Sequence, residues 1–156
     1  MTYSRPYLRW SALAALAAAL LLVLPVPPAA AQTLRGLGGE QLSEADLGRG
    51  TTIIVVWASW SPRGRNIDGR VNALVDRWGG DARVVTVNFQ EDRATVEEFL
   101  RGKSLRAPVF LDTDGAFSKK NAVTNLPGLL VIRDGNTAFR GKLPDDADAV
   151  IAEIVG

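Results

Sequence analysis

A run of β-branched and apolar residues, Thr51 to Trp57, constrains the fold more than any other part of the sequence. Its apolar residues follow one another without the alternation that a half-exposed strand shows. This pattern is typical of a central strand that is buried on both faces. The run therefore predicts an α/β protein in which a sheet carries helices on both sides.

This run and the residues after it indicate a strand, a helix and a second strand. One helical face, followed by two glycines, comprises Ile67, Val71, Leu74, Val75 and Trp78. A strand, a short helix, a brief strand and another helix are then expected at 83–89, 94–101, 108–111 and 116–121. A helix between two buried strands implies a parallel crossover.

The C-terminal third predicts a hairpin and a last helix. Residues 129–132 and 138–141 flank Asp134-Gly135-Asn136, whose turn chemistry is typical of a β-hairpin. Residues 145–155 are expected to close the chain as a helix. Together these elements predict one domain, residues 51–156, with a central mixed sheet of four or five strands flanked by helices. The Gly-rich segment 32–50 is expected to be a lead-in that packs irregularly.

Residues 1–31 have the layout of a secretory signal peptide. Arg5 and Arg9 precede the apolar run 10–24, prolines at 25, 27 and 28 end that run, and Ala29-Ala30-Ala31 offers a cleavage site. We expect cleavage and export to the bacterial periplasm. An uncleaved anchor is the alternative, and membrane contact is expected only through this segment. A lipoprotein is excluded because the chain has no cysteine to receive the lipid.

The composition excludes several kinds of chemistry. The chain has no cysteine and no histidine, so it offers neither a thiol nor an imidazole proton shuttle. Without Arg5 and Arg9, 16 basic residues face 17 acidic ones, and this near-neutral charge gives no case for nucleic-acid binding. We expect no cofactor and no metal. Asp112 and Asp114 suggest a metal loop only weakly, and a turn with capped N–H groups is favoured.

Residues 55–65 carry the motif on which a family resemblance rests. They read Val-Val-Trp-Ala-Ser-Trp-Ser-Pro-Arg-Gly-Arg, and they resemble the Phe-Trp-Ala-Thr-Trp-Cys-x-x-Cys-Arg stretch of the exported TlpA/ResA branch of the thioredoxin-like superfamily. The resemblance implies a thioredoxin fold. It also implies that Ser61 replaces the attacking cysteine and Gly64 the resolving cysteine. The chain therefore resembles a family of redox proteins but lacks the two cysteine thiols that carry out their reaction.

The resemblance extends over most of the chain after residue 50. It includes segments 84–92 and 108–115, and segment 123–135, where it implies that Pro127 is the family's cis-proline and that Leu126 presents its backbone to a ligand. It further implies that Val55 occupies the place of a buried aspartate that assists proton transfer to the resolving cysteine. An uncharged residue suits that place once the thiol is gone, because an unpaired buried carboxylate destabilises the fold.

Two polar features of the motif have more than one interpretation. Ser61 as a nucleophile would need a nearby base, and a structural role is favoured, with Ser61 as the N-cap and Pro62 as the first residue of the following helix. Arg63 and Arg65 are expected in the first turn of that helix. They either hold an anion or an acidic partner there, or simply point into water.

We therefore predict a redox-inactive thioredoxin-like protein of the periplasm that binds a peptide or protein partner. The expected binding surface is the former active site and comprises Trp60, Ser61, Pro62, Arg63, Leu126 and Pro127. The alternative is a thiol-disulfide oxidoreductase, as family membership alone would imply, and the absence of cysteine disfavours it. A third interpretation is a structural or anion-binding domain.

Overall fold

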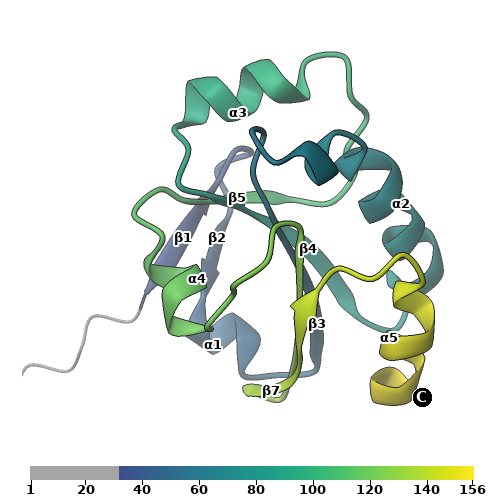
Figure 1. The fold of residues 1–156 in the computed structure, drawn as a ribbon. Coiled ribbons are helices and arrows are strands. Elements are labelled where there is room, and N and C mark those ends of the chain that lie inside the picture. Colours follow the sequence, from purple (N-terminus) through teal and green to yellow (C-terminus); the bar gives the residue numbers. More distant parts are fainter. Residues whose placement is uncertain (1–31) are drawn as a thin grey trace, which may run out of the picture.

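The computed structural model describes residues 32–156. The predicted signal peptide, residues 1–31, lies outside the described residues. The elements follow in the order β1 (Thr33–Gly36), β2 (Gln41–Ser43), α1 (Glu44–Leu47), β3 (Thr51–Trp57), the 3-10 turn η1 (Pro62–Gly64), α2 (Ile67–Trp78), β4 (Arg83–Phe89), α3 (Arg93–Leu100), β5 (Val109–Asp112), α4 (Ala116–Lys120), β6 (Gly128–Arg133), β7 (Asn136–Lys142) and α5 (Ala147–Val155) (Figure 1). None of these helices has both the length and the apolar character needed to cross a bilayer.

All the strands join one mixed sheet in the order β2-β1-β5-β4-β3-β6-β7. Strands β3, β4 and β5 run parallel, and β6 runs antiparallel to β3. Strand β3 lies between β4 and β6, and residues 53–57 are completely buried. The predicted central strand and the predicted parallel crossover are therefore confirmed.

Two more strands are present than the sequence led us to expect. The sheet has seven strands rather than four or five, because the lead-in segment 32–50 contributes β1 and β2. Leu34 pairs with Leu42 across this N-terminal hairpin, and Arg35 pairs with Leu111 of β5. The expectation that this segment packs irregularly was wrong, since main-chain pairing with β5 makes it an extension of the sheet.

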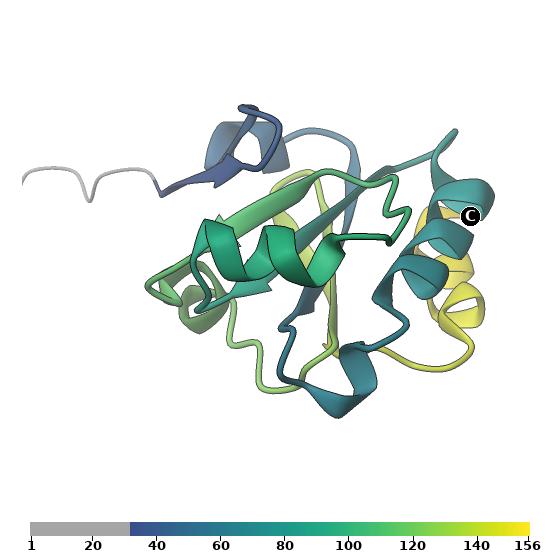
Figure 2. The ribbon, with the colours of Figure 1, turned by 90° about the horizontal axis from the view of Figure 1, so that it is seen from above.

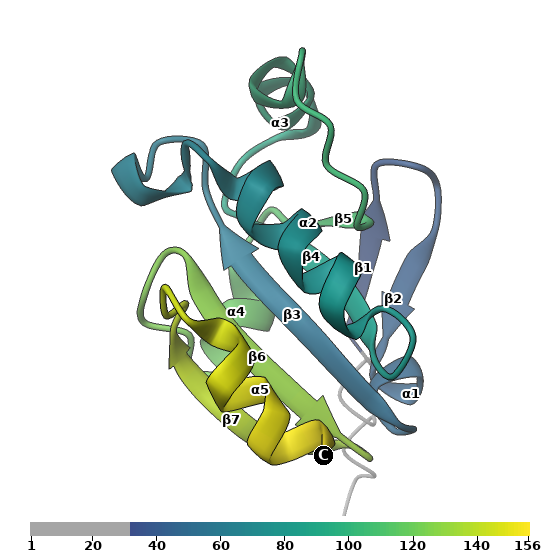
Figure 3. The ribbon, with the colours of Figure 1, turned by 90° about the vertical axis from the view of Figure 1, so that its right-hand side faces the viewer.

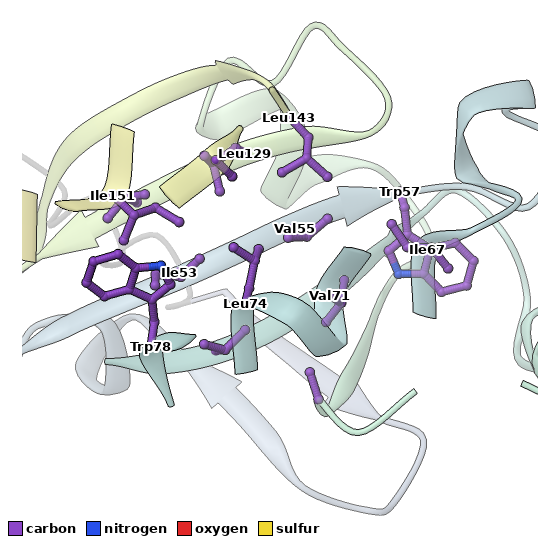
Figure 4. Packing of buried hydrophobic residues seen from close by; sticks show 14 of the residues in the cluster. Ile53, Val55, Trp57, Ile67, Val71, Leu74, Trp78, Leu129, Leu143 and Ile151 are labelled. Carbon is purple, nitrogen blue, oxygen red and sulfur yellow. The ribbon is translucent and has the colours of Figure 1, made fainter. Parts of the chain in front are cut away.

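Helices cover both faces of the sheet (Figures 2 and 3). Helices α2 and α5 lie side by side on one face, where the Trp78 Nε1–H donates to the Asp148 carboxylate at 2.9 Å. Their apolar faces pack on the inward side chains of β3 and β6 (Figure 4). Leu47 of α1 and Phe117 of α4 pack on the opposite face. The predicted buried face of α2 is confirmed, with Val75 at its margin.

The hairpin between β6 and β7 turns at Asp134 and Gly135, as predicted. Their φ angles are 48° and 80°, which is the pair of positive angles that a two-residue type I′ turn requires. The Asp134 carboxylate also accepts the Gly50 N–H at 2.8 Å. The turn is thus fastened to the start of β3.

Candidate functional site

The candidate site lies where β3 ends and the chain turns into η1. The Ser61 N–H donates to the Ala58 carbonyl at 3.2 Å, and the Gly64 N–H donates to the Ser61 carbonyl at 2.9 Å. Strand β3 is paired with β4 on one side and β6 on the other, so the turn starts from a strand that is held on both edges. The loop that precedes β6 lies beside it (Figure 2).

Ser61 joins these two loops. Its side chain is nearly buried, with 4% of the residue exposed, and its hydroxyl donates to the Leu126 carbonyl at 3.1 Å. The Leu126–Pro127 peptide bond is cis. Pro127 is buried, and its carbonyl accepts the Leu143 N–H at 2.9 Å. The Ser61 hydroxyl and the Leu126 carbonyl are thus bonded to each other within the protein.

The start of the helix differs from the prediction. Ser61 precedes η1 and Pro62 is its first residue, but the Ser61 side chain caps no N–H group. Helix α2 begins only at Ile67, after Asn66. Ser61 is the predicted N-cap by position, but its hydroxyl is committed to Leu126. Arg63 lies in η1, as expected for the first helical turn after Pro62, whereas Arg65 follows η1, and both residues precede α2.

Gly64 occupies a place with no room for a side chain. A Cβ atom at this residue would lie 2.8 Å from the Ala58 carbonyl oxygen, which belongs to the backbone and cannot swing away. Any larger residue therefore requires η1 to shift. This close approach is a further reason, besides the missing sulfur, why the turn does not reproduce a two-cysteine motif.

Trp60 is the outward-facing part of the site. Its exposed fraction is 62%, and it is the only large hydrophobic residue so exposed among residues 32–156. It borders an open cavity of about 380 Å³ whose other lining residues are Ser61, Phe89, Ser118, Val123, Thr124 and Leu126. The predicted residues Trp60, Ser61 and Leu126 are thus brought together. Pro62 and Arg63 are exposed on the turn but do not line the cavity.

A buried carboxylate that the sequence analysis did not identify holds the residue before Trp60. Glu91 is 8% exposed, and its carboxylate accepts the Ser59 N–H at 2.8 Å and the Asn88 side-chain amide at 2.7 Å. It also accepts the Ser59 hydroxyl. Because Glu91 lies after β4, these bonds tie the loop under Trp60 to the next strand of the sheet.

The predicted capped turn after β5 is confirmed. Asp112 is fully buried, and its two carboxylate oxygens accept the N–H groups of Phe117 at 3.0 Å and Ser118 at 2.9 Å. Asp114 accepts the Ala116 N–H at 3.0 Å. These aspartates therefore orient α4, the helix that carries Ser118 to the wall of the cavity.

Comparison with known proteins shows which fold this architecture belongs to. No family model matches the chain. The sporulation thiol-disulfide oxidoreductase A of Bacillus subtilis is 25% identical over 114 residues, which are 70% of this chain and 68% of that protein. The exposed lipoprotein thioredoxin Etrx1 of Streptococcus pneumoniae superposes with a TM-score of 0.70 at 20% identity, over 80% of this chain and 98% of the other. The fold is thioredoxin-like.

A second solved structure agrees with this thioredoxin-like fold. A Chlorobium tepidum protein provisionally assigned as thiol:disulfide interchange protein DsbE superposes with a TM-score of 0.68 at 23% identity, over 80% of this chain and 90% of the other. The similar proteins are thus thiol-disulfide oxidoreductases or thioredoxins by name. This thioredoxin-like chain differs from what those names describe because it has no cysteine.

The buried residues of β3 that lead into the thioredoxin-like motif are apolar. Val55 and Trp57 are fully buried, and the Trp57 ring lies 5.4 Å from that of Phe99. Both residues belong to the core beneath α2 (Figure 4). No buried carboxylate occupies the Val55 position, where the family resemblance implies an aspartate. The core beneath the turn therefore offers no proton acceptor of its own at that position.

Proposed function

We propose that this protein is a redox-inactive, thioredoxin-like periplasmic protein that binds a peptide or protein partner at the former active site. Its role is that of an accessory in the assembly or maturation of the bacterial envelope. The observation that carries the proposal is the exposed Trp60 beside an open cavity, on a turn without sulfur. We call Trp60 and the residues that line this cavity the Trp60 surface.

The physical basis of the proposal is that a partner can bind to a surface of complementary shape, whereas thiol–disulfide exchange requires a thiolate. A large aromatic side chain left in water is a frequent anchor in protein interfaces, because its burial supplies much of the binding free energy. The loop under Trp60 is held by Glu91 and Ser61. A surface fixed before binding loses little conformational entropy when a partner arrives.

The similarity to oxidoreductases supports the fold of this chain and not their reaction. Thiol–disulfide exchange proceeds through a thiolate that attacks a sulfur atom, and the sequence supplies no such atom. Export is supported by the signal-peptide layout of residues 1–31. The description of the Streptococcus pneumoniae structure as an exposed lipoprotein is consistent with an extracytoplasmic setting.

Co-purification from periplasm with matched variants tests the proposal. A partner retained by the wild-type protein is expected to be lost with Trp60→Ala, whose binding free energy we expect to weaken by about 1–3 kcal/mol. Arg101→Ala is the control, since Arg101 lies exposed after α3 and pairs only with the neighbouring Glu98. A partner that is retained equally by Trp60→Ala and by wild type would contradict the proposal.

A further inference from the structure

The chain segments around the Trp60 surface carry basic residues and no acidic ones. Residues 32–156 contain 16 basic and 17 acidic residues, yet segments 57–67, 115–132 and 136–144 contain no Asp or Glu. Their basic residues are Arg63, Arg65, Lys119, Lys120, Arg140 and Lys142. Among these residues only Lys120 forms an ion pair within the range 32–156, with Glu44. Uncompensated positive charge is therefore concentrated on this side of the domain.

Three of these cations lie along the loop between α4 and β6, which supplies one wall of the cavity. Lys119 is exposed in the last turn of α4. The Arg140 guanidinium donates to the Asn121 carbonyl at 3.3 Å, where the loop begins. Lys142 pairs with Gly128 in the sheet, where the loop ends. Because alternate residues of a strand share one face, Arg140 and Lys142 lie on the same side of β7.

A fourth cation lies on the other loop of the site. Arg63 is exposed in η1, two residues after Ser61. The buried acid of the site, Glu91, already accepts hydrogen bonds from Ser59 and Asn88. We call the four exposed cations the cationic rim: Arg63, Lys119, Arg140 and Lys142. The cavity that they border is lined by no charged residue.

We propose that the cationic rim binds an acidic segment of the partner, in which Asp or Glu residues flank the apolar side chain that enters the cavity. This inference rests on the proposed function and names the chemistry of the partner. A carboxylate inside the cavity would lose its hydration without gaining a counter-charge, whereas a carboxylate beside it meets the rim. Opposite charges at the edge of an interface speed association and disfavour partners of like charge.

Two blocked pentapeptides test the role of charge: acetyl-Asp-Asp-Leu-Asp-Asp-amide, and acetyl-Asn-Asn-Leu-Asn-Asn-amide, which has nearly the same shape without the charge. Their dissociation constants are measured by following backbone amide signals of the ¹⁵N-labelled protein by NMR. Two exposed ion pairs correspond to a preference for the acidic peptide of about two- to thirtyfold. We expect this preference at about 0.01 M salt, and we expect it to disappear at about 1 M salt, where charges are screened within about 3 Å.

A matched pair of double variants locates the effect. Lys119→Gln/Lys142→Gln is expected to lower the preference by at least about twofold. The control Arg49→Gln/Arg83→Gln removes two exposed cations before β3 and at the start of β4, and it is expected to keep the preference. Each of these strands has seven residues, so the control positions lie about 20 Å from the Trp60 end of the sheet. Thermal unfolding of both variants checks that they fold.

Three peptide results would overturn the inference. They are equal affinity of wild type for the two peptides at low salt, a preference unchanged in Lys119→Gln/Lys142→Gln, and no binding of the acidic peptide at millimolar concentration. Vesicles of phosphatidylcholine with phosphatidylglycerol form a parallel arm. If the protein binds these vesicles and does not distinguish the two peptides, the rim serves a membrane surface and the inference is overturned.

The partner obtained by co-purification separates this inference from the proposed function. Its binding to Trp60→Ala and to Lys119→Gln/Lys142→Gln is measured in parallel at low salt. If the partner is lost with Trp60→Ala while the lysine variant retains full affinity, the proposed function stands and this inference fails. If the lysine variant weakens binding and Trp60→Ala does not, the rim is supported and the Trp60 anchor is refuted.

Discussion

The close approach of Gly64 to the Ala58 carbonyl leads to a quantitative prediction. The Cβ atom of Gly64→Ala would lie 2.8 Å from that oxygen, where ordinary contact begins at 3.4 Å. Overpacking of this kind destabilises by about 1–3 kcal/mol. The loss is partly offset by about 0.4–1 kcal/mol, because alanine restricts the unfolded chain more than glycine does. We expect Gly64→Ala to lower the free energy of unfolding by about 1–2 kcal/mol.

Gly80→Ala is the matched control for this measurement. A Cβ atom at Gly80 would meet nothing within 4 Å, so only the effect on the unfolded chain remains and a gain of about 0.4–1 kcal/mol is expected. Urea unfolding at 25 °C, followed by far-UV circular dichroism, measures both variants. If Gly64→Ala proves as stable as Gly80→Ala, the steric reasoning about η1 is refuted.

The same geometry bears on attempts to restore a redox motif. A cysteine at residue 64 brings the same Cβ atom toward Ala58. Reduced Ser61→Cys/Gly64→Cys is therefore expected to be less stable than Ser61→Cys alone, by about as much as Gly64→Ala is less stable than wild type. The turn would have to shift before cysteines at residues 61 and 64 could form a disulfide.

Three further predictions concern the buried carboxylate, the lost chemistry and pH. Glu91→Ala removes the acceptor of the Ser59 N–H and the Asn88 amide, and urea unfolding should show a loss of about 2–4 kcal/mol, against less than about 0.5 kcal/mol for the exposed Glu98→Ala. Insulin reduction with dithiothreitol should not exceed the no-protein blank; activity of a preparation free of other thioredoxins would refute the absence of exchange. The pKa of Asp92 lies below its ordinary value of 3.8, first because its carboxylate accepts the Thr95 N–H. Its contribution to stability is complete above pH 3.8 and is lost as pH falls through the lowered pKa, so Asp92→Asn should flatten the acid limb of the unfolding free energy.

The parts of the fold that were predictable have strong local patterns. The uninterrupted apolar run of β3 and the periodic face of α2 each identify their element without knowledge of the rest of the chain. The Asp134-Gly135 pair identifies the hairpin turn, because these residue types tolerate the positive φ angles that the turn requires. Segment 32–50 has weaker patterns, because β1 and β2 are only four and three residues long. Its one usable signal is Ser43 followed by Asp46, a capping box that begins α1.

The candidate site was predictable only along the motif. Trp60, Ser61 and Leu126 were expected together because the family resemblance relates the two loops that carry them. Phe89 and Ser118 were not predicted as site residues, because they lie on β4 and α4, outside the motif at residues 55–65. Ser118 in particular lies on the five-residue helix α4, which is too short for its periodicity to indicate which side chain faces a cavity.

The pairing of β1 with β5 has a consequence for the order of folding. The N-terminal hairpin closes through local contacts, since Leu34 pairs with Leu42. We expect it to dock only after Leu111 has joined the sheet, because Arg35 pairs with that residue of β5. Contacts so distant along the chain slow folding. Until then the outer edge of β5 is bare, and at high concentration that edge is where two incompletely folded chains would pair with each other.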